Sequence, residues 1–112
     1  MADLTLYGLK NCDSCRKAMK ALQANGHRVS FFDIRKEANL AEKLPLWLEK
    51  SGSDVLINRR STSWRQLDET ARQMPPLDLL CEHPTLIKRP VIEAEDTLYI
   101  GWTKAIEAKL IT

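Results

Sequence analysis

Hydrophobic and polar positions at the start of the chain predict a strand, a helix and a second strand. Residues 4–7 form a short apolar run with the length and the β-forming residues of a buried strand. A helical pattern begins at Cys12, carries its apolar side chains on one side, and has a plausible stop at Gly26. Residues 29–34 then resemble a second strand. Because a helix separates the strands, we expect them to pair in parallel through a right-handed crossover.

The middle of the chain has the pattern of several helices. Apolar positions in residues 40–50 recur at helical spacing, and Ser63 is an N-cap candidate for a helix that ends at Met74. Residues 77–82 predict another short helix, which must end before Pro84. We expect Cys81 in this helix to pack in the core, because it follows two leucines.

The end of the chain predicts a hairpin and a last helix. An apolar strand starts directly after Arg89 and Pro90, and residues 97–100 return as its partner. Residues 102–110 have the spacing of a packed helix. The order is therefore β-α-β, a helical block, then β-β-α. With two cysteines after the first strand, this order predicts the α/β fold class, as a thioredoxin-like mixed sheet with a helical insertion.

Length and composition limit the class of protein. At 112 residues we expect one domain over residues 1–112, and 44% hydrophobic with 29% charged residues is typical of a soluble globular protein. A net charge of +2 gives no electrostatic reason to expect nucleic acid or a membrane as partner. No apolar run approaches the ~20 residues of a membrane span, and the start has no signal pattern, so we expect a cytoplasmic protein.

The spacing of Cys12 and Cys15 predicts a redox-active thiol site. A cysteine at a helix N-terminus lies at the positive end of the peptide dipole, which favours thiolate over thiol. Lys10, Arg16 and Lys17 add positive charge nearby. Cys15 lies one helical turn further on and can reach back to Cys12, so that it is either a resolving thiol or a packed side chain. Three cysteines are a poor disulfide framework, which also favours redox chemistry.

Further candidates are residues that could bind an anion near Cys12. Arg89 precedes a proline at the start of a strand expected to face the redox loop, and Arg59 and Arg60 form a basic pair in a loop. Asn11 and Ser14 lie around Cys12, where each could help line an anion site or simply cap the helix. The two histidines lack the spacing of a zinc site with the cysteines, and we expect no metal.

Three separated motifs together resemble the ArsC/Spx family, and most closely its short YffB-like reductase branch. They are LYGLKNCDSCRKA at residues 6–18, LINRRSTSWR at residues 56–65 and HPTLIKRPV at residues 83–91. The resemblance covers essentially the whole chain. It implies a thioredoxin-like fold with a helical insertion at about residues 38–87. It also implies a Cys12 nucleophile, oxyanion contacts from Arg89 and from Arg59 or Arg60, and a cis Pro90 packed opposite the active-site loop.

The resemblance also implies an activity. Arsenate reductases of this family use a cysteine thiolate to attack arsenate, and glutathione or glutaredoxin resolves the adduct. We therefore expect a glutathione-dependent thiol oxidoreductase that acts on a small oxyanion or mixed disulfide, with no bound cofactor. Two features depart from these reductases: Cys15 is an additional cysteine, and Lys104 lies in the segment where they carry a third arginine.

Two alternatives remain at this point. The Cys12–Cys15 pair also resembles the Spx side of the family, whose members are redox-sensing transcriptional regulators that bind RNA polymerase. Those regulators are generally longer at the C-terminus, which favours the reductase interpretation. A third possibility is a glutathione-binding domain without turnover. Sequence alone names neither the physiological substrate nor the electron donor.

Overall fold

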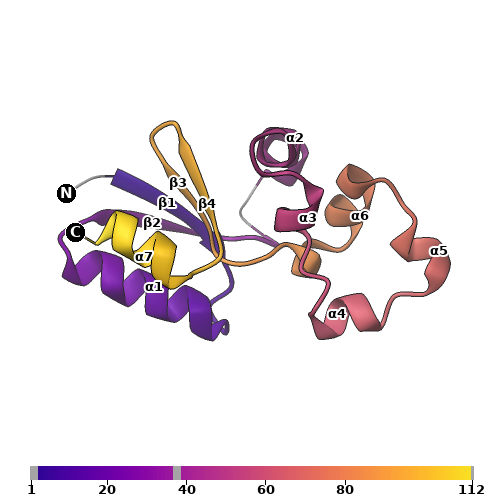
Figure 1. Ribbon diagram of the computed structural model, residues 1–112, viewed down its shortest axis with the longest axis horizontal. Helices are drawn as coiled ribbons and strands as arrows, with labels where there is room; N and C mark the ends of the chain where they lie inside the picture. Colours follow the sequence, from indigo (N-terminus) through magenta and orange to yellow (C-terminus); the bar gives the residue numbers. More distant parts are fainter. Residues whose placement is uncertain (1–2, 37–38, 112) are drawn as a thin grey trace. The chain divides into compact units, whose positions relative to one another are not determined.

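The computed structural model describes residues 3–36 and 39–111, which form a four-stranded sheet, seven α-helices and one short 3-10 helix (Figure 1). Backbone contacts divide this part of the chain into two compact units. The first unit combines the residues up to Lys36 with those from Arg89 onward, and it contains all four strands. The second unit comprises Asn39–Lys88 and is helical. That the whole chain forms one domain stays a prediction.

The sheet of the first unit is mixed and has the order β2-β1-β3-β4. Strand β1 (Asp3–Gly8) pairs in parallel with β2 (Arg28–Asp33), which confirms the predicted parallel pair. On its other edge β1 pairs antiparallel with β3 (Val91–Ala94), which continues into the hairpin partner β4 (Thr97–Ile100). Strand β1 therefore lies between two neighbouring strands, and it ends at Gly8.

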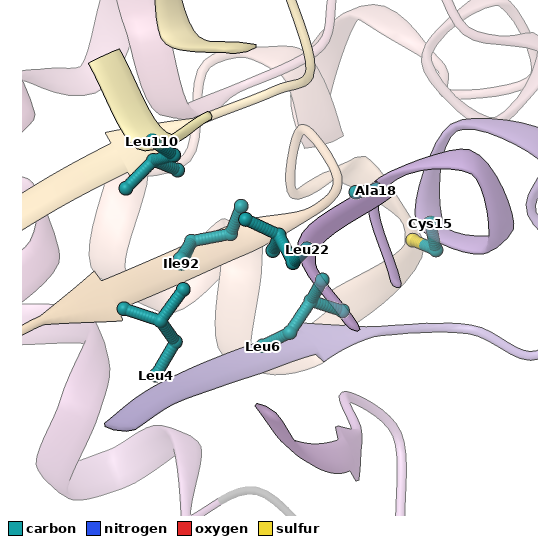
Figure 2. Close-up of a cluster of buried hydrophobic side chains, with 7 residues drawn as sticks. All are labelled: Leu4, Leu6, Cys15, Ala18, Leu22, Ile92 and Leu110. Atoms are coloured by element: carbon teal, nitrogen blue, oxygen red, sulfur yellow. The ribbon is translucent and has the colours of Figure 1, made fainter. Parts of the chain in front are cut away.

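Two helices lie on the same side of this sheet: α1 (Asp13–Ala24) and α7 (Lys104–Leu110) (Figure 1). Their apolar side chains pack with those of β1 and β3 in one buried cluster (Figure 2). Alternate positions of a strand face the same side of a sheet, which is why Leu4 and Leu6 both join the cluster. Its other members are Cys15, Ala18, Leu22, Ile92 and Leu110. A cysteine of the candidate site is thus part of the core.

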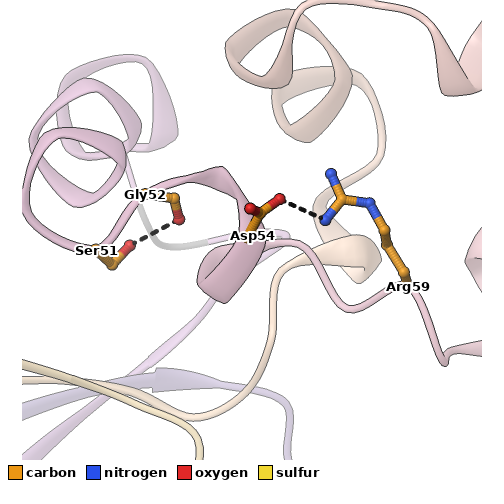
Figure 3. Close-up of polar contacts among 4 residues, drawn as sticks. All are labelled: Ser51, Gly52, Asp54 and Arg59. Carbon is orange, nitrogen blue, oxygen red and sulfur yellow. Dashed lines mark hydrogen bonds and ion pairs between the residues drawn. The ribbon is translucent and has the colours of Figure 1, made fainter.

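The second unit consists of one 12-residue helix and several shorter helices. They are α2 (Leu40–Ser51), α3 (Ser53–Leu56), α4 (Thr62–Arg65), α5 (Glu69–Arg72), α6 (Pro76–Glu82) and the 3-10 helix η1 (Pro84–Leu86). Ser51 Oγ donates a hydrogen bond to the carbonyl of Gly52 at the end of α2 (Figure 3). An isolated antiparallel bridge between Ile57 and Ile87 joins the ends of α3 and η1.

The observed order of elements is the predicted one, and the fold is a thioredoxin-like mixed α/β fold with helices between β2 and β3. Within the described residues, no helix is both long and apolar enough to cross a membrane.

The single helix predicted from Ser63 to Met74 is wrong. Two one-turn helices, α4 and α5, occupy this segment. Ser61 caps the first, because its hydroxyl accepts a hydrogen bond from the backbone N–H of Trp64. Asp68 starts the second by accepting from the N–H of Ala71, and this cap competes with continuation of the first helix.

Two further predictions differ from the structure. Cys81 is exposed and not in the core. Helix α6 buries Leu79 and Leu80, and the next position is rotated by about 100° around a 3.6-residue turn, away from the buried side. The last helix begins two residues later than predicted, at Lys104, because Thr103 caps it by accepting from the N–H of Ile106.

Candidate active site

Cys12 lies at the N-cap of α1, directly after the turn that follows β1. The turn is closed by a hydrogen bond of 3.1 Å from the backbone N–H of Cys12 to the carbonyl of Leu9. The carbonyl of Cys12 then accepts the N–H of Arg16 at 3.0 Å, which begins the helix. The thiol is therefore held at the end of a helix where the first N–H groups have no intrahelical partner. Its side chain is half-buried.

Cys15 lies one turn further along α1 and is buried, with 1% of its surface exposed. Its sulfur packs against Gly8, at the end of β1. A Cβ atom added to Gly8 would lie 2.4 Å from Cys15 Sγ, a distance that real Cβ contacts essentially never show. Gly8 is therefore required by this close approach.

Arg89 is half-buried and comes from the segment before β3. The peptide bond between Arg89 and Pro90 is cis, as the resemblance implied, and Pro90 is buried. The carbonyl of Pro90 accepts a hydrogen bond of 2.8 Å from the N–H of Gly101, which follows β4. Since β3 lies beside β1 in the sheet, this segment reaches the end of β1 from which the Cys12 turn starts.

The environments of the two thiols move their pKa values in opposite directions. Partial burial opposes ionisation of Cys12, but its interactions with the backbone amide and thiol of Cys15 and with the guanidinium of Arg89 outweigh it, so the pKa of Cys12 lies below the ordinary 9.0. Burial raises the pKa of Cys15 to about 12, and the neighbouring Cys12 contributes in the same direction.

This asymmetry gives the two cysteines different chemical abilities. Thiolates, and not thiols, are the nucleophiles in thiol chemistry. Cys12 is partly exposed and favours the thiolate, so it can attack a substrate. Cys15 is buried and favours the thiol, so it can interact with Cys12 as a proton-bearing neighbour. The structure therefore brings together three of the residues predicted from the sequence: Cys12, Cys15 and Arg89.

Asn11 and Ser14 flank Cys12, and both are exposed. Ser14 lies in the first turn of α1 and lines a cavity of about 320 Å³ together with Trp102 and Lys104. A role for either residue in anion binding stays a prediction. Within the described residues, no three histidine, cysteine or acidic side chains are grouped so as to hold a metal ion.

Arg59 and Arg60 belong to the second unit, where they line a cavity of about 490 Å³ with Lys88. Arg59 donates to Asp54 at 3.1 Å (Figure 3) and lies over the ring of Trp64, 5.4 Å from its centre. These contacts stabilise the loop locally. Binding of a substrate anion by Arg59 or Arg60 stays a prediction.

Sequence reasoning missed the role of Gly8, which directly follows the apolar run of residues 4–7. The sequence does contain a signal for this role: Gly8 ends the strand that leads into the Cys12 turn, and Cys15 lies in the first turn of the helix that follows. It also missed the pair formed by Tyr7 and Glu93, whose side chains join neighbouring strands by a 3.0 Å hydrogen bond. Both features depend on which side chains lie opposite each other in the sheet and core.

Comparison with known proteins identifies the family. The ArsC family model matches residues 7–108. The global transcriptional regulator Spx of Bacillus subtilis is 32% identical over 90% of this chain and 81% of its own. A solved arsenate reductase (ArsC) related protein from Brucella melitensis is 35% identical with a TM-score of 0.77, over 96% of this chain and 93% of that one. The solved protein YFFB is 28% identical with a TM-score of 0.87, over 97% of this chain and 99% of that one. The chain therefore belongs to the ArsC family.

Proposed function

We propose that this protein is a thiol-dependent reductase of the arsenate-reductase type, with Cys12 as nucleophile and glutathione as reductant. The observation that carries this proposal is the pair of unlike thiols at the start of α1. Cys12 has a lowered pKa beside Arg89, and Cys15 has a pKa raised to about 12 behind it. Thiol–disulfide exchange needs an attacking thiolate, and a second thiol beside it can resolve the mixed disulfide that forms.

With a mixed disulfide as substrate, the thiolate of Cys12 attacks one sulfur of the substrate. A new sulfur–sulfur bond forms to Cys12 as the substrate disulfide breaks, and the released thiolate takes a proton from solvent. A second thiol, from Cys15 or from glutathione, then loses its proton and attacks the new bond. With the glutathionyl group on Cys12, attack by Cys15 releases glutathione and leaves a Cys12–Cys15 disulfide, which two further glutathione molecules reduce. Attack by glutathione instead gives free Cys12 and glutathione disulfide directly. Two electrons pass from thiols to substrate in each cycle.

With arsenate, the first bond joins the sulfur of Cys12 to arsenic, and one oxygen leaves as water. A second thiol then loses its proton and forms a disulfide with the Cys12 sulfur as the sulfur–arsenic bond breaks. The electron pair of that bond stays with arsenic, which leaves as arsenite. In both cases negative charge gathers beside Cys12. The guanidinium of Arg89 is placed to stabilise that charge, because it already interacts with the Cys12 sulfur. Arginine also suits an oxyanion or carboxylate, since its fork can donate two parallel hydrogen bonds.

A coupled assay tests the proposal. Oxidation of NADPH through glutathione reductase would be measured with glutathione plus either arsenate or a glutathione mixed disulfide. We expect turnover with at least one substrate, and its loss in Cys12→Ser. Cys81→Ser is the matched control, because Cys81 is an exposed thiol in the second unit and should leave turnover unchanged. Equal rates for wild type and Cys12→Ser would contradict the proposal, and glutathione binding without turnover would then favour a binding domain.

A redox-dependent regulator is the second candidate, because the Spx relative is similar over 90% of this chain. In this case oxidation of Cys12 and Cys15 to a disulfide would change a surface that binds RNA polymerase. The discriminating experiment is a pull-down of purified polymerase with oxidised and reduced protein. Retention that depends on oxidation and is lost in Cys15→Ser would favour the regulator, and no retention in either state would exclude this form of regulation.

A further inference from the structure

A cavity of about 470 Å³ opens in the first unit, beside the buried thiol of Cys15. Its walls come from the turn after β1, from α1 and from β2. The apolar part of the wall is formed by Leu9, Met19 and Phe31, each of which is partly exposed. The volume lies in the range of about 300–1,000 Å³ that is typical of small-molecule sites. Covering such a partly exposed apolar wall with an apolar group removes it from water, which favours binding.

The charges at this cavity are positive. Lys10, Arg16 and Lys20 all contribute to its lining, and all three are exposed. Arg16 is already occupied, because its guanidinium forms an ion pair with Asp13. In the part of the chain that the structure describes, no carboxylate forms an ion pair with Lys10 or Lys20. The two ammonium groups are therefore available to an anion from solution.

We propose that this cavity binds a small amphipathic anion, such as a medium-chain aliphatic or aromatic carboxylate. The apolar body covers Leu9, Met19 and Phe31, while the carboxylate meets Lys10 and Lys20. Neither part suffices alone, because an exposed ion pair contributes only about 0–1 kcal/mol and the apolar wall lacks charge selectivity. Together they favour a ligand that is apolar along its body and negative at one end.

This site is distinct from the reaction proposed for Cys12, although both include Cys15. The redox chemistry uses the Cys12 sulfur and Arg89, neither of which lines the cavity. The cavity is lined by the turn at Leu9 and Lys10, by residues 15–23 of α1 and by Phe31. Binding can therefore be measured without turnover, and failure of one proposal leaves the other standing.

The test is a titration of uniformly ¹⁵N-labelled protein with octanoate, well below its micelle-forming concentration, followed through the amide resonances. We expect saturable shifts concentrated at Leu9, Lys10, Met19, Lys20 and Phe31. Two further ligands separate the contributions: 1-octanol has the chain without the charge, and acetate has the charge without the chain. Octanoate should bind more tightly than either.

Charge-reversal variants provide the matched control. Lys20→Glu places a negative charge at the cavity and should weaken octanoate binding roughly threefold or more. Lys17→Glu makes the same change on the same helix, but Lys17 lines a different cavity, so its effect should be less than about twofold. Both positions are exposed, so both variants should keep the wild-type spectrum. Shifts located elsewhere, equal binding of octanol, or equal weakening by both variants would overturn the proposal.

Discussion

The close approach of Cys15 to Gly8 makes a sharp prediction about packing in the active site. Gly8→Ala places a Cβ atom 2.4 Å from Cys15 Sγ and 3.3 Å from Cys15 Cβ. Ordinary contact begins at 3.4 Å, so the sulfur must move by about 1 Å. Cys15 has 1% of its surface exposed and belongs to the core cluster, so its neighbours restrict that movement. Overpacking of this kind costs about 1–3 kcal/mol, and we expect Gly8→Ala to lower the free energy of unfolding by that amount.

A double-mutant cycle with Cys15→Ala assigns the cause. Without Sγ the remaining close contact joins the new Cβ to the Cβ of residue 15 at 3.3 Å. A shift of a few tenths of an ångström relieves this contact. In this background Gly8→Ala should therefore cost no more than about 0.5 kcal/mol. The two substitutions should then be coupled by at least about 0.5 kcal/mol, within the range found for residues in contact.

Urea unfolding under reducing conditions, followed by far-ultraviolet circular dichroism, measures all four proteins, with free energies from linear extrapolation. Equal costs of Gly8→Ala in both backgrounds, within about 0.3–0.5 kcal/mol, would refute the reasoning. Gly8 would then be needed for a reason other than room for the Cys15 sulfur.

Three further predictions concern the thiol, a helix cap and the sheet. Arg89→Ala removes a positive charge that lowers the pKa of Cys12, so the pH of half-maximal alkylation of Cys12 should rise toward 9.0, and an unchanged or lower midpoint would contradict this electrostatic role. Ser61→Ala removes the side-chain cap of α4 and should cost about 1 kcal/mol in urea unfolding, whereas no loss would mean that the cap is not stabilising. Tyr7→Phe removes the hydrogen bond to Glu93 at 3.0 Å and should cost about 1.5 kcal/mol in thermal or urea unfolding, and a neutral effect would show that water replaces this bond.

Much of the sheet unit could be predicted because its local patterns and its tertiary packing agree. The apolar run at the start of the chain becomes β1, and the helical pattern after it becomes α1, with Cys12 at the N-cap. When a strand is followed by a short turn and a helix, only a few arrangements bury the apolar side of both elements. The position of Cys12 at a helix terminus followed from this order alone.

The larger errors lie in the second unit, where the helices from α3 to α6 are only one or two turns long. A one-turn helix shows too few positions for a 3.6-residue period to be recognised. The break between α4 and α5 depends on one capping side chain, Asp68, which local pattern does not distinguish from an ordinary helix residue. The prediction for Cys81 was wrong for a related reason. The two leucines before it suggested that it shares their buried face of α6, but Cys81 lies on the exposed face.

The candidate site was only partly accessible from local pattern. Cys12 and Cys15 follow from their spacing at a helix start, but Arg89 joins them from the far end of the chain through the pairing of β1 with β3. Its place before a proline at a strand start and the resemblance to a family indicated Arg89, whereas periodicity did not. The packing of Cys15 against Gly8 depends on which atoms meet in three dimensions, so it required the structure.

The central claim is that Cys12 is the attacking thiol, and when no reduced glutathione is added Cys15 is the neighbouring thiol that can resolve its adduct. The most direct measurement is the mass of peptides from protein that has reacted briefly with one equivalent of glutathione disulfide and has then been quenched with acid. We predict a glutathione adduct at Cys12 that gives way to a Cys12–Cys15 disulfide in wild type and persists in Cys15→Ser. Adduct that forms first at the exposed Cys81, with Cys12 unmodified, would contradict the account.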